Sequence, residues 1–176
     1  MTLLRAAVDL WRARRTPFAL IGAAAMAVHG VSRSTRDLDV LVASTECLAA
    51  SYWEPLLASG ATVDIRRGDE DDPLAGVVRL GLGGEPPLDV VVGKSAWQAG
   101  ILQRAQETSL EGVSVPVVRR VDLILLKLFA GGPQDAWDIE QLLDVPERAA
   151  LAREVQGRLD ALPEDSRQLW ARIAGA

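Results

Sequence analysis

The segment from Phe18 to Val42 constrains the fold of this chain more than any other part of the sequence. It reads FALIGAAAMAVHGVSRSTRDLDVLV, so an apolar run leads into a turn of small residues, and a second apolar run carries two acids. Residues two apart in a strand point to the same face, so Asp37 and Asp39 would project together. Two neighbouring carboxylates at the edge of a core repel each other without a cation. The segment therefore predicts a site for a nucleotide phosphate and a divalent metal.

The composition is that of a globular chain with an acidic balance. The 176 residues suit a single domain, and the 49% of apolar residues can form a core. The net charge of −5 argues against a broad basic surface for nonspecific nucleic-acid binding, although a local basic patch is compatible with it. The single cysteine, Cys47, excludes an intrachain disulfide and a structural zinc cluster. The sequence shows neither a secretory signal nor a membrane span, so we expect a soluble, cytoplasmic protein.

Apolar spacing, caps and breakers predict an α/β architecture, in which a small mixed β-sheet is flanked by helices and followed by a C-terminal helical segment. Helices are predicted over 2–15, 23–28, 46–58, 95–107, 120–130, 133–143, 146–162 and 164–174. Strands are predicted over 18–21, 37–42, 61–66, 77–82, 88–92 and 113–118. We expect one domain over 1–176, with the α/β core at 18–118 and the C-terminal helices at 119–176.

A third acid, Asp89, interrupts the apolar run Leu88-Asp-Val-Val-Val92. A carboxylate inside an apolar strand costs free energy unless it is paired or bound to a metal. If this strand neighbours 37–42, three carboxylates converge, and three can hold two metal ions. Two alternatives stay open. The Asp37 and Asp39 pair also fits a solvated strand end, and Asp89 also fits the start of a strand.

The other candidate residues suit phosphate binding. Gly22 and Ala23 follow a strand and open a helix, where backbone N–H groups favour an anion and small side chains permit close approach. Tight packing of the helix on the sheet would explain the same residues. Arg33 and Thr35 lie in the loop before the acids, where an arginine binds phosphate or pairs with a carboxylate.

Further along the chain, Lys127 interrupts an apolar helix, so its ammonium either reaches an anion or extends to the surface. Asp135 and Asp138 share a face of the next helix, and an exposed helix start would also accommodate them. His29, the only histidine, lacks a histidine or cysteine partner for a metal, which favours a structural role at the end of its helix.

The order of these features resembles the nucleotidyltransferase (polymerase-beta-like) superfamily. Its pattern is a Gly-Gly or Gly-Ser turn, an Asp-x-Asp strand and a third carboxylate, matched here by Gly22-Ala23, by Asp37-Leu38-Asp39 and by Asp89. The run from Ile21 to Asp39 also looks like the AbiEii-type branch, which includes toxins of toxin–antitoxin systems, as does the Lys-then-Asp pair of helices over 122–138. Ala23 departs from the pattern, because alanine lacks the serine hydroxyl although it keeps the backbone N–H.

The resemblance implies a specific set of site residues. Asp37, Asp39 and Asp89 would bind two Mg²⁺ ions, and an NTP would place its triphosphate near Gly22 and Ala23. An acceptor hydroxyl would attack the α-phosphate, pyrophosphate would leave, and Asp89 would help to deprotonate the hydroxyl. The further residues implied in substrate binding are Arg33, Thr35, Lys127 and Asp135.

We therefore expect an enzyme that moves an NMP from an NTP to an acceptor hydroxyl on an RNA end or a protein. Only residues 144–176 follow the Lys–Asp helices, which favours a macromolecular acceptor, a homodimer or a minimal toxin with a cognate antitoxin. One alternative is a degenerate module that binds nucleotide or a partner protein without turnover, which the Ala23 departure supports. Others are a nucleotidyltransferase that modifies an antibiotic, and a structural α/β protein whose acids only decorate the surface.

Overall fold

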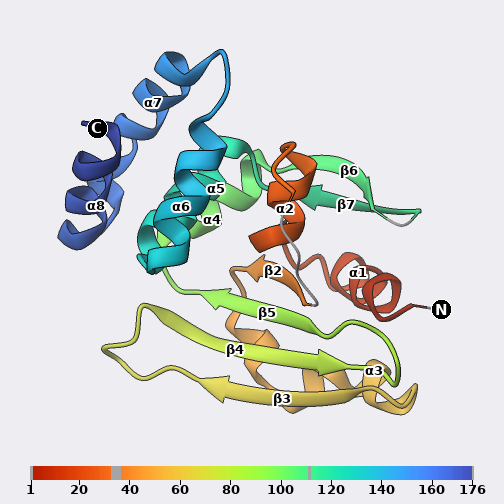
Figure 1. The fold of residues 1–176 in the computed structure, drawn as a ribbon. Helices are drawn as coiled ribbons and strands as arrows, with labels where there is room; N and C mark the ends of the chain where they lie inside the picture. Colours follow the sequence, from red (N-terminus) through yellow and green to blue (C-terminus); the bar gives the residue numbers. More distant parts are fainter. Residues whose placement is uncertain (1, 33–36, 111, 176) are drawn as a thin grey trace. The chain divides into compact units, whose positions relative to one another are not determined.

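The computed structural model describes residues 2–32, 37–110 and 112–175 and confirms the predicted α/β architecture (Figure 1). Its mixed, seven-stranded sheet has the order β3-β4-β5-β2-β1-β7-β6. The strands are β1 (Phe18–Ile21), β2 (Leu38–Val42), β3 (Thr62–Arg67), β4 (Leu74–Gly81), β5 (Leu88–Gly93), β6 (Gln106–Leu110) and β7 (Val113–Val117). The pairs β1–β7 and β2–β5 are parallel, and the other neighbours are antiparallel.

Helices lie before, between and after the strands along the chain. The α-helices are α1 (Leu3–Ala13), α2 (Gly22–Val28), α3 (Glu54–Ala58), α4 (Ala96–Arg104), α5 (Arg120–Ala130), α6 (Pro133–Leu143), α7 (Arg148–Gln156) and α8 (Glu164–Ala174). Three short 3₁₀ segments are η1 (Thr45–Leu48), η2 (Ala50–Trp53) and η3 (Leu159–Ala161). In the part of the chain that the structure describes, none of the helices combines the length and apolar character needed to cross a membrane.

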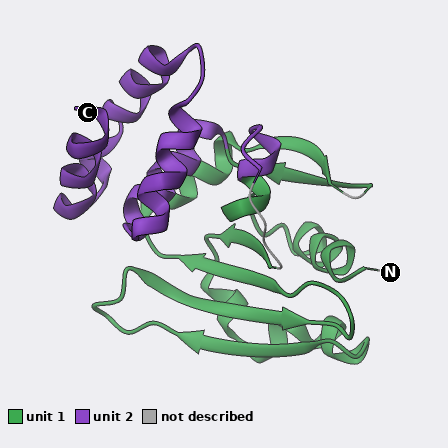
Figure 2. Cartoon of the chain, in the orientation of Figure 1, with its two compact units in different colours: residues 1–25, 33–118 green, residues 26–32, 119–176 purple. Residues whose placement is uncertain are grey.

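The chain divides into two compact units (Figure 2). Unit 1, residues 1–25 and 33–118, contains the whole sheet, and unit 2, residues 26–32 and 119–176, contains α5 to α8. Helix α2 begins in unit 1 and ends in unit 2. The sequence placed the end of the α/β core at residue 118, where unit 1 also ends. The assignment of 26–32 to unit 2 was not anticipated.

Three predicted helices differ from those observed, and one of them, 146–162, is α7 up to Gln156 followed by the separate 3₁₀ turn η3. The predicted helix 46–58 is two 3₁₀ turns followed by the short α3, because Ala49 is extended (φ −93°, ψ 132°) between η1 and η2. The indole N–H of Trp53 donates to the carbonyl of Cys47 over 2.7 Å, which stabilises this compact turn. The predicted helix 95–107 ends at Arg104, and the chain then enters β6, which pairs with β7. The polar sequence of β6 shows no alternation of apolar and polar residues that would have predicted a strand.

A hydrophobic core of unit 1 lies on the face of the sheet opposite Asp39 and Asp89, and Ala19 and Leu41 on the acidic face are buried as well. The strand residues on the core face alternate with those on the opposite face, and they are Phe18, Leu20, Val40, Val42, Val78, Leu80, Leu88, Val90 and Val92, all buried. Trp11 of α1 stacks on Phe18 with ring centroids 4.8 Å apart and meets Trp53 edge-on. Tyr52 and Thr16 share a buried hydrogen bond of 2.6 Å. These aromatic contacts attach α1 and the 45–58 segment to the apolar face, so that the charged residues of the strands remain on the other face.

Cys47 provides a test of this packing. Its side chain is buried, and burial raises the pKa of the thiol to about 11. We expect the native protein to react with Ellman's reagent at pH 8 far more slowly than the urea-unfolded chain, because the reactive thiolate is absent. The unfolded thiol ionises at lower pH than the folded one, so this group stabilises the fold below pH about 9 and loses that contribution as pH rises towards 11. Equal reaction rates for the native and unfolded chains would contradict the buried placement.

Candidate active site

The central feature of the site is the pairing of β2 with β5. The two strands are parallel neighbours, and Asp39 lies directly beside Asp89 in their register. Neighbouring strands are about 4.8 Å apart, and laterally paired residues point to the same face. Asp37 precedes β2 by one residue, two positions before Asp39. The structure therefore meets the condition set by the sequence, that the Leu88–Val92 strand neighbours the strand that follows Asp37.

Arg79 connects two of these acids. It lies on β4, paired with Asp89 in the register of β4 and β5. Its Nη1 donates to Asp89 Oδ2 and its Nη2 to Asp37 Oδ2, each over 3.1 Å. The guanidinium therefore bridges two carboxylates that belong to different segments of the chain. The sequence interpretation did not include Arg79. The available signal was its place in Val77-Val-Arg-Leu80, where one charged residue interrupts an apolar strand.

The electrostatic environment of Asp89 suits a group that accepts a proton. Burial raises the pKa of Asp89 above its ordinary value, the guanidinium of Arg79 opposes this increase, and the charge of Asp37 adds to it. The Asp89 side chain is 20% exposed, whereas that of Arg79 is 48% exposed. Because the pair is partly solvated, its net contribution to stability is small, and the arginine can change partners at little cost.

Gly22 brings the turn of small residues against Asp39. In the antiparallel pairing of β1 with β2, Ile21 lies opposite Asp39, and the chain turns at Gly22 with φ +63°. A Cβ atom at Gly22 would lie 2.0 Å from Asp39 Oδ2. Glycine is therefore required both by the left-handed backbone and by the space that the carboxylate occupies. The turn predicted to bind phosphate thus adjoins one of the predicted metal ligands.

These residues provide a donor set that fits a hard divalent cation. Three carboxylates lie on or next to two adjacent strands, and oxygen ligands on a rigid backbone suit Mg²⁺. Asp37 and Asp89 already share one positive group, the Arg79 guanidinium, so their carboxylates converge on a cation. Among the described residues, no three or more His, Cys, Asp or Glu side chains are arranged around one point as metal ligands. The structure therefore shows the carboxylates of Asp37 and Asp89 meeting at the Arg79 guanidinium, and Asp39 lies beside Asp89 in the register of the strands.

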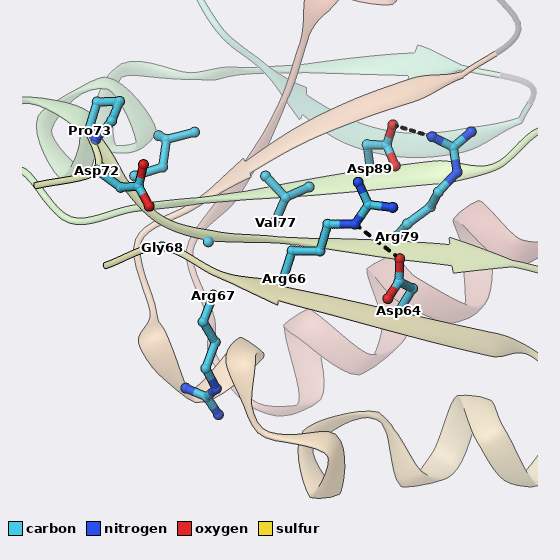
Figure 3. A pocket seen from close by; sticks show the side chains of 11 residues that line it. Asp64, Arg66, Arg67, Gly68, Asp72, Pro73, Val77, Arg79 and Asp89 are labelled. Carbon is cyan, nitrogen blue, oxygen red and sulfur yellow. Dashed lines mark hydrogen bonds and ion pairs between the residues drawn. The ribbon is translucent and has the colours of Figure 1, made fainter. Parts of the chain in front are cut away.

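A pocket of about 390 Å³ adjoins Asp89 on the same face of the sheet (Figure 3). Asp64 and Arg66 of β3 line it, together with Val77 and Arg79 of β4 and residues of the loop 68–74. The Arg66 Nε donates to Asp64 Oδ2 over 3.3 Å, and both side chains are largely exposed. Asp89 and Arg79 belong to both the pocket and the carboxylate group, so a compound in the pocket would lie next to them.

The predicted residues of unit 2 form a cluster of their own. Lys127 Nζ donates to Asp135 Oδ1 over 3.1 Å and to Asp138 Oδ2 over 2.5 Å. Asp138 is fully buried, rather than at an exposed helix start, and it also accepts from Gln134 Nε2. Asp135 Oδ2 accepts from the backbone N–H of Gly132 at the start of α6. The ammonium of Lys127 therefore ties α5 to α6.

The remaining predictions concern two segments. Arg33 and Thr35, predicted to bind substrate, lie outside the described residues. The carbonyl of His29 accepts a hydrogen bond from Arg120 Nη2 within unit 2, which accords with a structural role for this end of α2.

The comparisons with known proteins address the fold. Neither a protein-family model nor a curated protein sequence matches the chain. A candidate nucleotidyltransferase from Thermotoga maritima has a similar structure, with a TM-score of 0.55 and 12% identity over 81% of this chain and 91% of that one. The crystal structure of ANT(2'')-Ia in complex with adenylyl-2''-tobramycin gives a TM-score of 0.50 and 16% identity over 98% of this chain and 95% of that one. The chain therefore has the nucleotidyltransferase fold, and its solved structural neighbours are nucleotidyltransferase-fold proteins.

The Gly22 turn can be tested with a matched pair of substitutions. Gly22 and Gly60 both have positive φ, but a Cβ atom at Gly60 would meet nothing within 4 Å. We expect each glycine-to-alanine change to lower the free energy of unfolding by about 1–2 kcal/mol through backbone strain. Gly22→Ala should lower it further, because the Asp39 carboxylate must move. Urea unfolding of both variants measures the difference, and equal values would contradict the close approach of Asp39.

The buried ion pair of unit 2 gives a second stability prediction. Lys127→Met leaves the Asp138 carboxylate buried without its ammonium partner, which we expect to cost about 3–5 kcal/mol. Lys94, the only other lysine, has an exposed ammonium bonded to the carbonyls of Asp69 and Glu70, so Lys94→Met is the control, expected within about 1 kcal/mol of wild type. Chemical denaturation measures both variants. A Lys127→Met variant as stable as the control would show that the pair is not buried.

Proposed function

We propose that this protein is a Mg²⁺-dependent nucleotidyltransferase that moves an NMP from an NTP to an acceptor hydroxyl on an RNA end or a protein. The observation that carries this proposal is the placement of Asp39 between Gly22 and Asp89 in a nucleotidyltransferase fold. It brings the turn suited to the triphosphate and two carboxylates onto the neighbouring strands β1, β2 and β5.

Each group has a defined task in this reaction. Asp37, Asp39 and Asp89 would hold two Mg²⁺ ions, which supply charge neutralisation at the triphosphate. The backbone N–H groups of Gly22 and Ala23 bind the phosphates, and neither needs a side chain to do so. Asp89 accepts the proton of the acceptor hydroxyl. At the same time, the oxygen of that hydroxyl forms a bond to the α-phosphorus. The bond from the α-phosphorus to the bridging oxygen breaks, and pyrophosphate leaves with the electron pair.

The resemblance also implies a role in substrate binding for four further residues, which stays a prediction. These residues are Arg33, Thr35, Lys127 and Asp135. Within unit 2, the Lys127 ammonium donates to both Asp135 and Asp138. Asp135 would then act by orienting the lysine.

We also infer the biological setting from the resemblance. The AbiEii-type branch points to a cytoplasmic toxin with a cognate antitoxin. These inferences rest on the sequence motifs around Gly22, Asp37 and Asp39.

A second candidate function is nucleotide transfer to a small-molecule antibiotic. It is favoured by ANT(2'')-Ia, an antibiotic-resistance factor seen with adenylyl-2''-tobramycin, because this chain covers 95% of its length. A chain of comparable length therefore accommodates a small acceptor, which weakens the argument that a short C-terminal segment favours a macromolecule. The third candidate is a module that binds nucleotide without turnover. It is supported by Ala23, which stands where the family pattern has Gly or Ser.

Pyrophosphate release tests the proposal directly. Wild-type protein incubated with each NTP, Mg²⁺ and total cell extract should release pyrophosphate and transfer label from an α-labelled NTP to RNA or protein. Asp39→Asn should lower the rate by about 10²–10³-fold, because a preorganised charge at the reacting phosphate is lost. Asp9→Asn, an exposed change on α1, is the matched control and should retain the rate. Binding of NTP and Mg²⁺ with no release of pyrophosphate would favour the non-catalytic module.

A further inference from the structure

We propose that the pocket beside Asp89 is the acceptor site, that it takes a phosphate-bearing hydroxyl compound, and that Arg79 passes from the carboxylates to that compound when the divalent cation binds. This inference rests on the proposed function and extends it to the class of acceptor.

The position of the pocket supports its role in binding the acceptor. Asp89, the group that takes the proton from the acceptor hydroxyl, lines the pocket directly. A hydroxyl seated there lies within reach of the carboxylate, which is the first requirement for a general base. The volume of about 390 Å³ is within the range of small-molecule sites and accommodates roughly one nucleotide. Val77 supplies an apolar side chain for the sugar or base to contact.

The charges of the pocket favour a phosphate over a cationic acceptor. Arg66 is 80% exposed at its side chain and makes a solvated ion pair with Asp64, so its guanidinium is available to a second anion. Asp64 and Asp89 each already face an arginine, and the third carboxylate of the lining, Asp72, accepts from the backbone N–H of Asp69. An arginine fork binds phosphate through two parallel hydrogen bonds, which suits both Arg66 and Arg79.

The placement of Arg79 links acceptor binding to the metal. Its guanidinium lies between Asp37 and Asp89, the two carboxylates that the proposed cation would use. A divalent ion carries twice the charge of the guanidinium, so it displaces Arg79 from both oxygens. Arg79 also lines the pocket, and its side chain is half exposed, so it has room to turn there. The pocket thus gains a second available guanidinium only after the carboxylates hold a metal.

The test measures binding rather than turnover. A fluorescein-labelled, single-stranded oligoribonucleotide with a free 3′ hydroxyl is titrated with protein by fluorescence anisotropy, with and without Mg²⁺ and a non-hydrolysable NTP analogue. An unlabelled nucleoside 5′-monophosphate competes in a second arm. Wild-type protein should bind the oligonucleotide about 3–10-fold more tightly with the metal present, although Mg²⁺ screens ordinary electrostatic binding and weakens it. Competition by the monophosphate is expected, because the pocket accommodates roughly one nucleotide.

Three arginine variants separate the parts of the proposal. Arg79→Gln should lose the enhancement by Mg²⁺, and Arg79→Lys, which keeps the charge, should restore part of it. Arg66→Gln should weaken binding in both conditions and lower the dependence of log K on log salt by about 0.7, as for one lost phosphate contact on a single strand. Arg15→Gln is the control and should match wild type, because exposed Arg15 precedes β1, which β5 and β2 separate from β4 of the pocket. Circular dichroism verifies that each variant is folded.

Two results would overturn the inference. In one, Mg²⁺ weakens binding equally in wild type and Arg79→Gln, as simple screening predicts. In the other, tobramycin binds the pocket more tightly than the oligonucleotide does, and Asp64→Asn abolishes that binding. If pyrophosphate release stays dependent on Asp39 in either case, the proposed function stands and only the assignment of the pocket fails. If that release is also absent, the proposed function fails independently.

Discussion

The parallel pairing of β2 with β5 is the interaction on which the site depends. The strands come from segments about fifty residues apart, and their register sets Asp39 beside Asp89 while Val40 and Val90 face the core. A slip of one residue in either strand would turn the acid of that strand into the core and its valine to the opposite face. The apolar face, held by α1 and the 45–58 segment, therefore fixes the position of the carboxylates. Packing on one face of the sheet determines the chemistry available on the other.

Once the register is set, the acids need compensating charge. Arg79 supplies it across β4 and β5, and Arg66 with Asp64 continues an alternation of charges along the same face. Pairs that are this exposed contribute little to stability, so they favour exchange of partners over rigidity. The Lys127–Asp138 pair in unit 2 is the opposite case. It is buried, and removing either partner leaves an uncompensated charge, so its main effect is to hold α5 against α6.

The Gly22 turn shows how a local and a non-local constraint meet at one residue. The backbone leaves β1 with φ +63°, which alone favours glycine. The antiparallel pairing of β1 with β2 then places the Asp39 carboxylate where a side chain would stand.

Local periodicity allowed the sequence alone to predict the α/β class, the shared face of Asp37 and Asp39, the acid within the strand 88–92 and the turn at Gly22. Each depends on residues within a few positions of one another. The tertiary structure decided what depends on distant partners: that β5 lies beside β2, that 106–110 pairs with β7 as a strand, and that 45–58 folds as short turns around Trp53. It also placed Arg79 between Asp37 and Asp89, and Lys127 against Asp138. Strand order and register follow from the packing of the whole core, so a local sequence pattern does not predict which strands become neighbours.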